Sequence, residues 1–553
     1  MPNNRVPDGN RGYRHPFVFG LHYLGGVGGE HPEMLTDLAM SQFSAEIRRI
    51  PEWWKHFKDD ETRRKWTESA LQRTWNILTP SAEIGTRLSL AQINYVLDEL
   101  AGYASLRHDE LECQVSCFER IWESDSLLSS ASIRNLSMAL DELRTHNTSS
   151  REHHALNYFI DPALYPLVYN KTLVSQRDGK LLPIPSPISS DIYTVSSRFA
   201  LLPADVSVGA TTGSVKFSSY INNLHPGDHG KAYELLETLL GGFIPLFERT
   251  LTDLHRNNPL TPRISGGYRY LVWDEPEPPD HSDDEDGWII YEKEIRQWAL
   301  NRPINVPDIP ATGYKDGIEV RKHQVNLKGR SLQFIVSAYE ISLSPENSSY
   351  VGTTWHVEGM KNNRIVASGF YCLSTDNISE TSIEFRMAVT FPRGFTAGDT
   401  GATLRTWGVR DGDSCNQHIG HVPIRPGLAL VFPNIYQHKQ TAFQLKDTSR
   451  DGHLKAIWFY LVDPDIEPLP STSRVGPQQK YWIHKALDDF LDERLPHEII
   501  DKIMLHVEGV MSLEEALAYK ECLLEENRRF TQANNSYHFC IPFDIWNGPE
   551  VIH

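Results

Sequence analysis

Three side chains of this sequence have the types and spacing to hold one divalent metal ion: His356, Glu358 and His438. His356 and Glu358 lie in residues 351–360 (VGTTWHVEGM), and His438 ends residues 427–438 (GLALVFPNIYQH). Two imidazoles and one carboxylate on one face of a divalent iron leave the opposite face open for other ligands. The pattern therefore predicts a non-haem iron site.

The triplet His-x-Asp/Glu is a weak signal alone, because composition gives about three by chance. It occurs five times, beginning at His31, His108, His281, His356 and His506. On a strand, residues i and i+2 share a face, so His356 and Glu358 can point at one ion if residues 352–358 are extended. His506 lies in a helical apolar pattern, where its carboxylate partner points about 200° away. These contexts favour His356.

The third ligand has two rivals to His438 in the same part of the sequence, His418 and His421. His438 follows the apolar segment 428–432, which is typical of a buried strand. Neither rival follows such a segment. We therefore expect His438 to complete the site.

The part of the sequence around these residues is rich in expected strands. They cover residues 332–343, 352–358, 364–373, 382–389, 404–409, 427–432, 438–445 and 453–462. Eight strands without intervening helices favour a double-stranded β-helix, which is a jelly-roll, cupin-like barrel. The mouth of such a barrel is a natural ligand pocket.

Periodicity predicts an α+β protein in four parts. Residues 1–150 form an N-terminal helical region, with helices expected near residues 33, 61, 90 and 130. Residues 151–317 form a mixed region, with a strand and two helices (231–240 and 244–254) that pack on the barrel. Residues 318–464 form the jelly-roll metal-binding core. Residues 465–553 form a C-terminal helical region.

Composition limits the function classes. The chain has 54 basic and 72 acidic residues, a net charge of −18, which argues against nucleic acid and anionic membranes as partners. No window approaches 18 apolar residues, and the N-terminus lacks the apolar core of a secretory signal. We expect an intracellular, cytoplasmic protein whose six scattered cysteines stay reduced.

Several motifs resemble a known family. Gly427-x4-Phe432-Pro433-x4-His438, with the strand ending at Pro464, resembles the closing strands of Fe(II)/2-oxoglutarate-dependent dioxygenases. With residues 219–226 and 355–360, these motifs make the chain similar to a broad fungal family known mainly as a domain of unknown function. The resemblance implies that His356, Glu358 and His438 bind Fe(II), leaving three positions for 2-oxoglutarate and O2.

The resemblance also implies a cation for the far carboxylate of 2-oxoglutarate. Such dioxygenases commonly place it two residues after a Gly on the last strand, a position that Leu454 occupies here. Lys455, Arg450 and Arg386 are the three candidates that remain for binding the cosubstrate.

Four further residues are candidates for a substrate pocket: Tyr220, Asn222, Asn223 and Trp355. The two asparagines also suit a turn at the end of a strand, and Trp355 also suits packing in the barrel. The sequence leaves both readings open.

Three functions fit these residues. The first is a 2-oxoglutarate-dependent oxygenase that oxidises a small molecule or a protein side chain. The second is a cupin-like metalloenzyme that needs no keto acid. The third is a non-catalytic barrel used for binding or as a scaffold. Iron content separates the first two from the third, and succinate release separates the first from the second.

Overall fold

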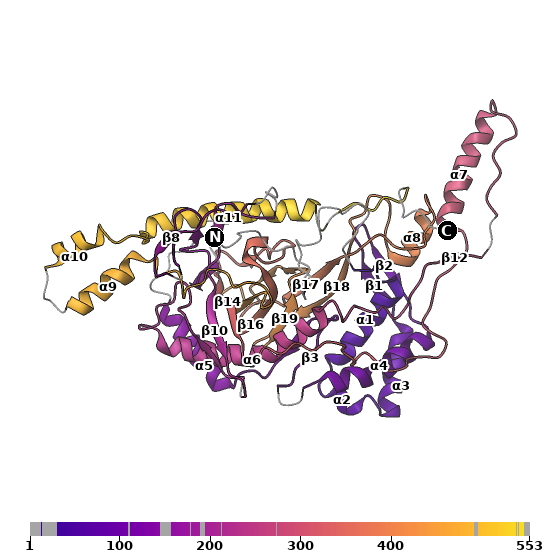
Figure 1. The fold of residues 1–553 in the computed structure, drawn as a ribbon. Helices are drawn as coiled ribbons and strands as arrows, with labels where there is room; N and C mark the ends of the chain where they lie inside the picture. Colours follow the sequence, from indigo (N-terminus) through magenta and orange to yellow (C-terminus); the bar gives the residue numbers. More distant parts are fainter. Residues whose placement is uncertain are drawn as a thin grey trace.

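The computed structural model describes residues 13, 30–108, 111–143, 156–176, 178–188, 194–211, 213–271, 274–491, 496–537, 539 and 541–546. Strands occupy the middle of the molecule and helices surround them (Figure 1). The strand pairs are antiparallel. The predicted α+β class is confirmed.

One large antiparallel sheet forms the centre. Its strand order is β11 (Val215–Phe217), β10 (Ala204–Val208), β14 (Ser331–Leu343), β22 (Gly452–Val462), β16 (Ile365–Asp376), β19 (Ala429–Pro433), β4 (Trp122–Ser124) and β3 (Gln114–Val115), with β5 (Leu156–Ile160) also pairing with β14. The sheet therefore recruits strands from residues 114–217, well before the expected core at 318–464.

A smaller sheet faces the large one. It contains β18 (Asn416–Pro423), β17 (Ser382–Ala388) and β20 (Tyr436–Gln440). The ring centroids of Phe385 on β17 and Phe432 on β19 are 4.9 Å apart, and those of His438 on β20 and Trp458 on β22 are 5.6 Å apart. The two sheets thus enclose an aromatic layer. Their strands are two separate sheets in the described residues, so a closed jelly roll is not confirmed.

The other face of the large sheet is covered by one long helix, α6 (Gly230–Leu254). Phe243 and Phe247 of α6 lie 5.5 Å and 5.4 Å from the rings of Phe459 and Phe334. The sequence predicts two helices here, but the helix continues through Pro245. Alternate residues of β22 therefore face either α6 or the smaller sheet.

Four predicted N-terminal helices are present: α1 (Leu35–Arg48), α3 (Asp60–Gln72), α4 (Leu90–Leu106) and α5 (Ser130–Asp141). Three of them begin at a side chain that accepts a main-chain N–H, namely Asp59, Ser89 and Ser129. A short helix α2 (Trp53–His56) and a hairpin of β1 (Trp75–Leu78) and β2 (Glu83–Thr86) were not expected.

Two expected strands are wrong. Residues 404–409 belong largely to helix α8 (Thr400–Trp407), because Asp399 caps its first turn and Gly408 ends it with a left-handed backbone at φ 70°. Residues 352–358 form an irregular segment that pairs with β20 only at His356. Four two-stranded sheets complete the β-structure: β6 (Leu167–Val168) with β9 (Phe199–Ala200), β7 (Leu173–Ser175) with β8 (Leu181–Pro183), β12 (Arg269–Tyr270) with β13 (Ile304–Asn305), and β15 (Ser349–Tyr350) with β21 (Phe443–Gln444).

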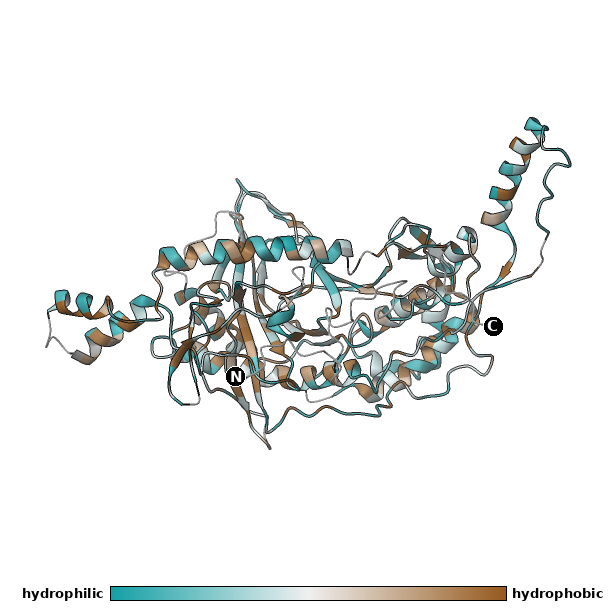
Figure 2. Cartoon of the chain, turned by 45° about the horizontal axis from the view of Figure 1, so that its top comes forward, coloured by the Kyte–Doolittle hydropathy of each residue, from teal (hydrophilic) through white to brown (hydrophobic). Residues whose placement is uncertain are grey.

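The C-terminal region is helical, as expected: α9 (Lys480–Leu491), α10 (His497–Met504) and α11 (Leu513–Tyr537). Helices α9 and α10 project at one end, and α7 (Glu285–Asn301) projects at the other (Figure 1). Both projections carry hydrophilic and hydrophobic residues (Figure 2). None of the helices in the described residues is long and apolar enough to cross a membrane.

Candidate metal centre

His356, Glu358 and His438 come together between the two sheets. Their ligand atoms all lie within 4.8 Å of one another, and theirs is the one group of three or more possible metal ligands in the described residues. Oε1 of Glu358 lies 3.3 Å from Nε2 of His438 and 3.6 Å from Nε2 of His356. The exposed fractions of the three side chains are 24% for His356, 17% for Glu358 and 3% for His438.

The two histidines are held side by side by the main chain. The N–H of His356 donates to the carbonyl of His438 at 3.1 Å, and the N–H of His438 donates back at 2.9 Å. Directly opposed residues of an antiparallel pair carry their side chains on the same face. The ring centroids are accordingly 4.3 Å apart. This single bridge replaces the strand that the sequence predicts at residues 352–358.

Glu358 is placed by Asn434, which lies between β19 and β20. Its Oδ1 accepts the N–H of Glu358 at 2.8 Å, and its Nδ2 donates to the carbonyl of Glu358 at 2.9 Å. Gly359 follows with a φ of 64°, and a Cβ there would lie 2.8 Å from Nδ2 of Asn363. The chain therefore turns directly after Glu358 at a position that suits only glycine.

The electrostatics suit metal binding. Burial raises the pKa of Glu358, but hydrogen bonds from the two imidazoles outweigh burial and bring it down to about 2. Burial lowers the pKa of His438 to about 4, with the neighbouring His356 adding to the effect. Burial also lowers the pKa of His356, but its contacts with Glu358 and the Thr354 carbonyl outweigh burial and raise it. An ionised carboxylate and a neutral imidazole are the forms that bind metals.

The histidine rings are oriented by their surroundings. Nδ1 of His356 lies 2.7 Å from the carbonyl of Thr354. It must donate there, so Nε2, which lies beside Glu358, is the nitrogen that remains to bind a metal. Phe432 and Trp458 lie 4.8 Å and 5.6 Å from the ring of His438. The aromatic layer therefore fixes the second imidazole.

A tyrosine adds a hydrogen bond to the carboxylate. The hydroxyl of Tyr460 on β22 bonds the Glu358 side chain, and burial keeps the pKa of this phenol well above its ordinary value. The phenol is therefore the donor. Ligating carboxylates in metal sites are commonly held by such outer partners.

Helix α11 supports the segment that carries two of the ligands. Phe530 of α11, together with Phe539 beyond the end of the helix, packs with Val357 and Met360, which lie on either side of Glu358. Asn535 donates to the carbonyl of Trp355 at 2.9 Å. The C-terminal region thus covers the metal-binding segment.

The donor set fits a divalent transition metal such as iron. Nδ1 of His438 is buried and has no hydrogen-bond partner among the described residues, and its buried Nε2 has the Glu358 carboxylate 3.3 Å away. Leaving a buried polar atom unpaired is unfavourable unless a ligand pairs it. A metal at Nε2 would satisfy this imidazole and balance the Glu358 carboxylate. The cluster is therefore compatible with iron.

Lys455 points away from this cluster. On β22, Trp458 and Tyr460 face the metal ligands, whereas Lys455 has the opposite parity and lies on the other face. Its Nζ bonds the carboxylate of Asp141 on α5 at 2.7 Å and 2.8 Å. The structure therefore does not place Lys455 on the metal-facing side of β22.

The two predicted arginines also lie elsewhere. Arg450 is exposed and pairs with Asp376 at 2.8 Å. Arg386 neighbours Phe385, which faces the aromatic layer, so Arg386 lies on the outer face of the smaller sheet. There its Nε donates to Gln437 at 2.6 Å, and its guanidinium carbon lies 4.7 Å from the Trp355 ring centroid. The structure therefore does not place Arg450, Arg386 or Trp355 at the metal-facing side.

The predicted pocket residues Tyr220, Asn222 and Asn223 bind other loops. Tyr220 donates to the carbonyls of residues 475 and 476, at 3.2 Å and 3.1 Å. Both asparagines donate to carbonyls within residues 161–165. Asn223 has a φ of 67°, which suits the turn reading. These side chains connect segments of the fold rather than line the metal site.

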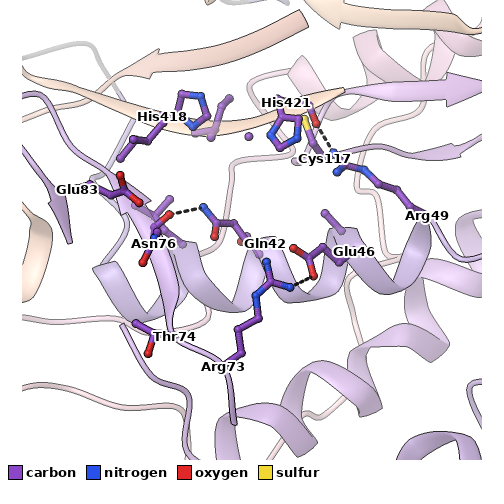
Figure 3. A pocket seen from close by; sticks show the side chains of 16 residues that line it. Gln42, Glu46, Arg49, Arg73, Thr74, Asn76, Glu83, Cys117, His418 and His421 are labelled. Atoms are coloured by element: carbon purple, nitrogen blue, oxygen red, sulfur yellow. Dashed lines mark hydrogen bonds and ion pairs between the residues drawn. The ribbon is translucent and has the colours of Figure 1, made fainter. Parts of the chain in front are cut away.

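The rival histidines lie on the outer face of the smaller sheet. The register of β17 with β18 shifts at Gly420, which has a φ of 123°, and this bulge puts His418 and His421 on one face. Both line a cavity of about 340 Å³ above Gln42 and Glu46 of α1 (Figure 3). Neither belongs to the metal cluster.

Sequence reasoning missed Asn434, Tyr460 and Tyr339. Asn434 and Tyr460 touch Glu358 across 76 or more residues of sequence. Tyr339 on β14 accepts a hydrogen bond from Nε1 of Trp458 at 3.2 Å. Along β22 every second side chain lies on the same face, so Tyr460 shares the metal-facing side with Trp458. This alternation, and the hydrogen bond of Tyr339 with Trp458, is the signal that could have identified the two tyrosines.

No curated protein sequence matches the chain. Structural similarity to the Fe(II)/(alpha)ketoglutarate-dependent dioxygenase TqaL covers 77% of this chain and 95% of that one, at 7% identity and a TM-score of 0.25. Similarity to IDO from Bacillus thuringiensis covers 24% and 45%, at 10% identity and a TM-score of 0.16. Similarity to the vicilin from Solanum melongena covers 41% and 49%, at 10% identity and a TM-score of 0.12. The chain spans less than half of the last two proteins, and TM-scores this low carry no argument.

The sequence itself matches one family model. Residues 90–486 match the model described as "Protein of unknown function (DUF4246)". This range includes His356, Glu358 and His438 and is more than half of the 553 residues. The chain belongs to the DUF4246 family.

Proposed function

We propose that the chain is a non-haem iron oxygenase that uses 2-oxoglutarate to oxidise a small molecule or a protein side chain. The observation that carries this proposal is the convergence of two imidazoles and one carboxylate from distant segments, with ligand atoms within 4.8 Å. Such a set occupies one face of iron and leaves the other face for cosubstrate and O2. We also propose that the two facing sheets are a double-stranded β-helix core.

His356, Glu358 and His438 would hold the iron. Bound iron and 2-oxoglutarate would supply the activation of O2 for substrate oxidation. The chain's own part is to fix the ligands and exclude water. Asn434 and Tyr460 hold Glu358, and Phe432 and Trp458 surround His438. These four side chains hold the ligand atoms close together, so the site is already formed when a metal binds.

Lys455, Arg450 and Arg386 all lie away from the metal. The far carboxylate of the cosubstrate would therefore be bound by uncharged hydrogen-bond donors. Tyr339 lies on the metal-facing side of β14, beside Trp458. Its hydroxyl accepts from Trp458 and has its own hydrogen to donate, since burial raises the pKa of this phenol.

Gln440 is the second donor of this kind. It follows His438 by two residues on β20 and so shares its face. Its buried Nε2 has no hydrogen-bond partner among the described residues. We propose that Tyr339 and Gln440 bind the far carboxylate of 2-oxoglutarate.

Succinate release tests this function. Protein purified without oxygen and loaded with Fe(II) is given 2-oxoglutarate and O2, and succinate is measured. Succinate above the iron-only blank, lost in His438→Ala and retained in His421→Ala, is the expected result. An iron-loaded protein that yields no succinate and does not bind 2-oxoglutarate would instead favour the keto-acid-independent metalloenzyme. The observation that favours this second function is that Lys455, Arg450 and Arg386 all lie away from the metal cluster.

A further inference from the structure

A separate cavity of about 440 Å³ lies between the N-terminal helices and the core. Its walls come from α1, α4, the C-terminal end of α6 and the loops at residues 257–263 and 314–322. None of the three metal-cluster residues lines it. It is therefore distinct from the metal centre.

The cavity wall has more acidic than basic side chains. Six acidic and four basic side chains line it. Arg263 is shared between Asp37, at 2.9 Å, and Glu99, at 2.8 Å. Arg321 pairs with Asp253. The guanidinium groups of Arg263 and Arg321 thus form ion pairs with three buried carboxylates.

A third guanidinium in the wall is also committed. Arg120 is buried and pairs at 2.6 Å with Glu30, which does not line the cavity. Its Nε donates to the main-chain carbonyl of Asp253 at 3.0 Å. Among the described residues, none of these three guanidinium groups forms a close ion pair with Glu33 or Glu119, and Arg263 acts on Glu33 only from farther away. The fourth base of the wall, Lys322, is exposed.

Glu33 is the unmatched group. Its exposed fraction is 8%, and its Oε2 is buried without a hydrogen-bond partner in the described residues. Its carboxyl group is hydrogen-bonded to that of Asp37, and burial together with this neighbour raises the pKa of Glu33 well above its ordinary value, so the two groups share a proton. Two buried carboxyl groups in contact are unfavourable unless a proton or a cation lies between or beside them. Glu119 differs, because it accepts a hydrogen bond from the hydroxyl of Tyr103.

The remaining wall suits an organic cation better than a metal ion. The rings of Tyr95 and Tyr314 meet edge to face with centroids 5.6 Å apart, and both line the cavity with Phe118. Aromatic faces attract ammonium groups and bury hydrocarbon. The acids of this wall do not form a group of three converging metal ligands in the described residues.

We propose that this cavity binds a small organic amine, with its ammonium group against Glu33 and its hydrocarbon part against Tyr95 and Tyr314. Its ammonium group takes the place of the proton that the Glu33 and Asp37 carboxyl groups otherwise share. The site is independent of iron and of 2-oxoglutarate.

Putrescine is the probe for this site, and calorimetric titration of the full chain is the measurement. We expect a dissociation constant below about 1 mM and a rise in melting temperature with putrescine, because a ligand of the native state stabilises it. Glu33→Gln keeps the shape of the side chain and removes its charge. It should weaken putrescine binding at least tenfold.

Three controls make the outcome decisive. Glu68→Gln, on the exposed face of α3, should bind putrescine as the wild type does. The uncharged isostere 1,4-butanediol and sodium chloride of equal ionic strength should not raise the melting temperature. No putrescine binding to the wild type up to 10 mM, equal binding by Glu33→Gln, or equal binding of butanediol would each overturn the proposal. If Glu33→Gln does not fold, Tyr314→Ala takes its place, because it removes one of the two rings proposed to hold the hydrocarbon part and should also weaken putrescine binding.

Discussion

The side chain of Asn434 makes two hydrogen bonds to the main chain of Glu358, one as acceptor and one as donor. The side chain accepts the N–H of Glu358 at 2.8 Å and donates to its carbonyl at 2.9 Å, and it also donates to the carbonyl of Ile365 at 3.0 Å. Asn434 precedes His438 by four residues. One amide therefore connects the segment that carries two ligands to the segment that carries the third.

Replacing Asn434 by Ala should weaken metal binding by about 10- to 100-fold, as is typical when an outer partner of a ligand is lost. The physical reason is that Glu358 loses its fixed position beside the two imidazoles. Mn(II) binding followed by electron paramagnetic resonance measures the change.

Asn377→Ala is the matched control for this variant. Asn377 is buried and donates to three main-chain carbonyls far from the metal, at 2.8, 2.9 and 3.2 Å. Both variants should lose about 1–3 kcal/mol in the free energy of unfolding. Only Asn434→Ala should lose Mn(II). Equal Mn(II) affinities in the two variants would show that Asn434 does not position the ligand.

Replacing Tyr339 by Phe should raise the dissociation constant for 2-oxoglutarate about tenfold, the effect of losing one hydrogen bond to a charged group. Iron content should not change, because Tyr339 is not a ligand. Tyr371→Phe is the control, since that hydroxyl is buried without a partner among the described residues and its ring meets α6. If Tyr339→Phe binds 2-oxoglutarate as tightly as the wild type, the proposed anchor is wrong.

Replacing Lys455 by Met should leave 2-oxoglutarate and metal affinity unchanged. The side chain pairs with Asp141, which is partly exposed and can be hydrated once the lysine is gone. The free energy of unfolding should fall by about 1 kcal/mol. Urea unfolding and calorimetry measure the two quantities. A tenfold loss of 2-oxoglutarate affinity in this variant would show that Lys455 does bind the cosubstrate.

Asp463, at the end of β22, should make stability depend on pH. Burial raises its pKa to about 6, from about 4 in an unfolded chain. The native state therefore binds this proton more tightly, and its stabilising effect is lost as the pH rises from about 4 to 6. Asp463→Asn should exceed the wild type in free energy of unfolding at pH 8, by at most about 3 kcal/mol, and match it near pH 4. The same difference at both pH values would contradict this pKa.

The long strands were predictable because their apolar runs are continuous. Residues 332–343, 364–373 and 453–462 are strands β14, β16 and β22 with bounds close to those expected. Residues 404–409 misled the prediction, because the segment is short and contains Trp407 and Val409, residue types that are common in strands. The Asp399 cap and Gly408 instead stabilise a helix there.

The three residues of the cluster could be grouped from the sequence, because His438 follows a buried apolar strand and His356 and Glu358 are two residues apart, although the structure brings them together by a single bridge rather than by a strand. The side chains that would bind a cosubstrate could not be chosen in this way. Whether Lys455 faces the metal depends on which face of β22 the smaller sheet covers, and that follows from the contact of Trp458 with His438. Contacts between distant segments, such as Asn434 with Glu358, have no local signal.

The iron stoichiometry of protein reconstituted without oxygen tests the metal centre most directly. We expect about one Fe(II) per chain for the wild type and for His421→Ala, and a loss of bound iron in His356→Ala and in His438→Ala, with all proteins folded by circular dichroism. Iron retained at the wild-type level in both ligand variants would contradict the assigned centre.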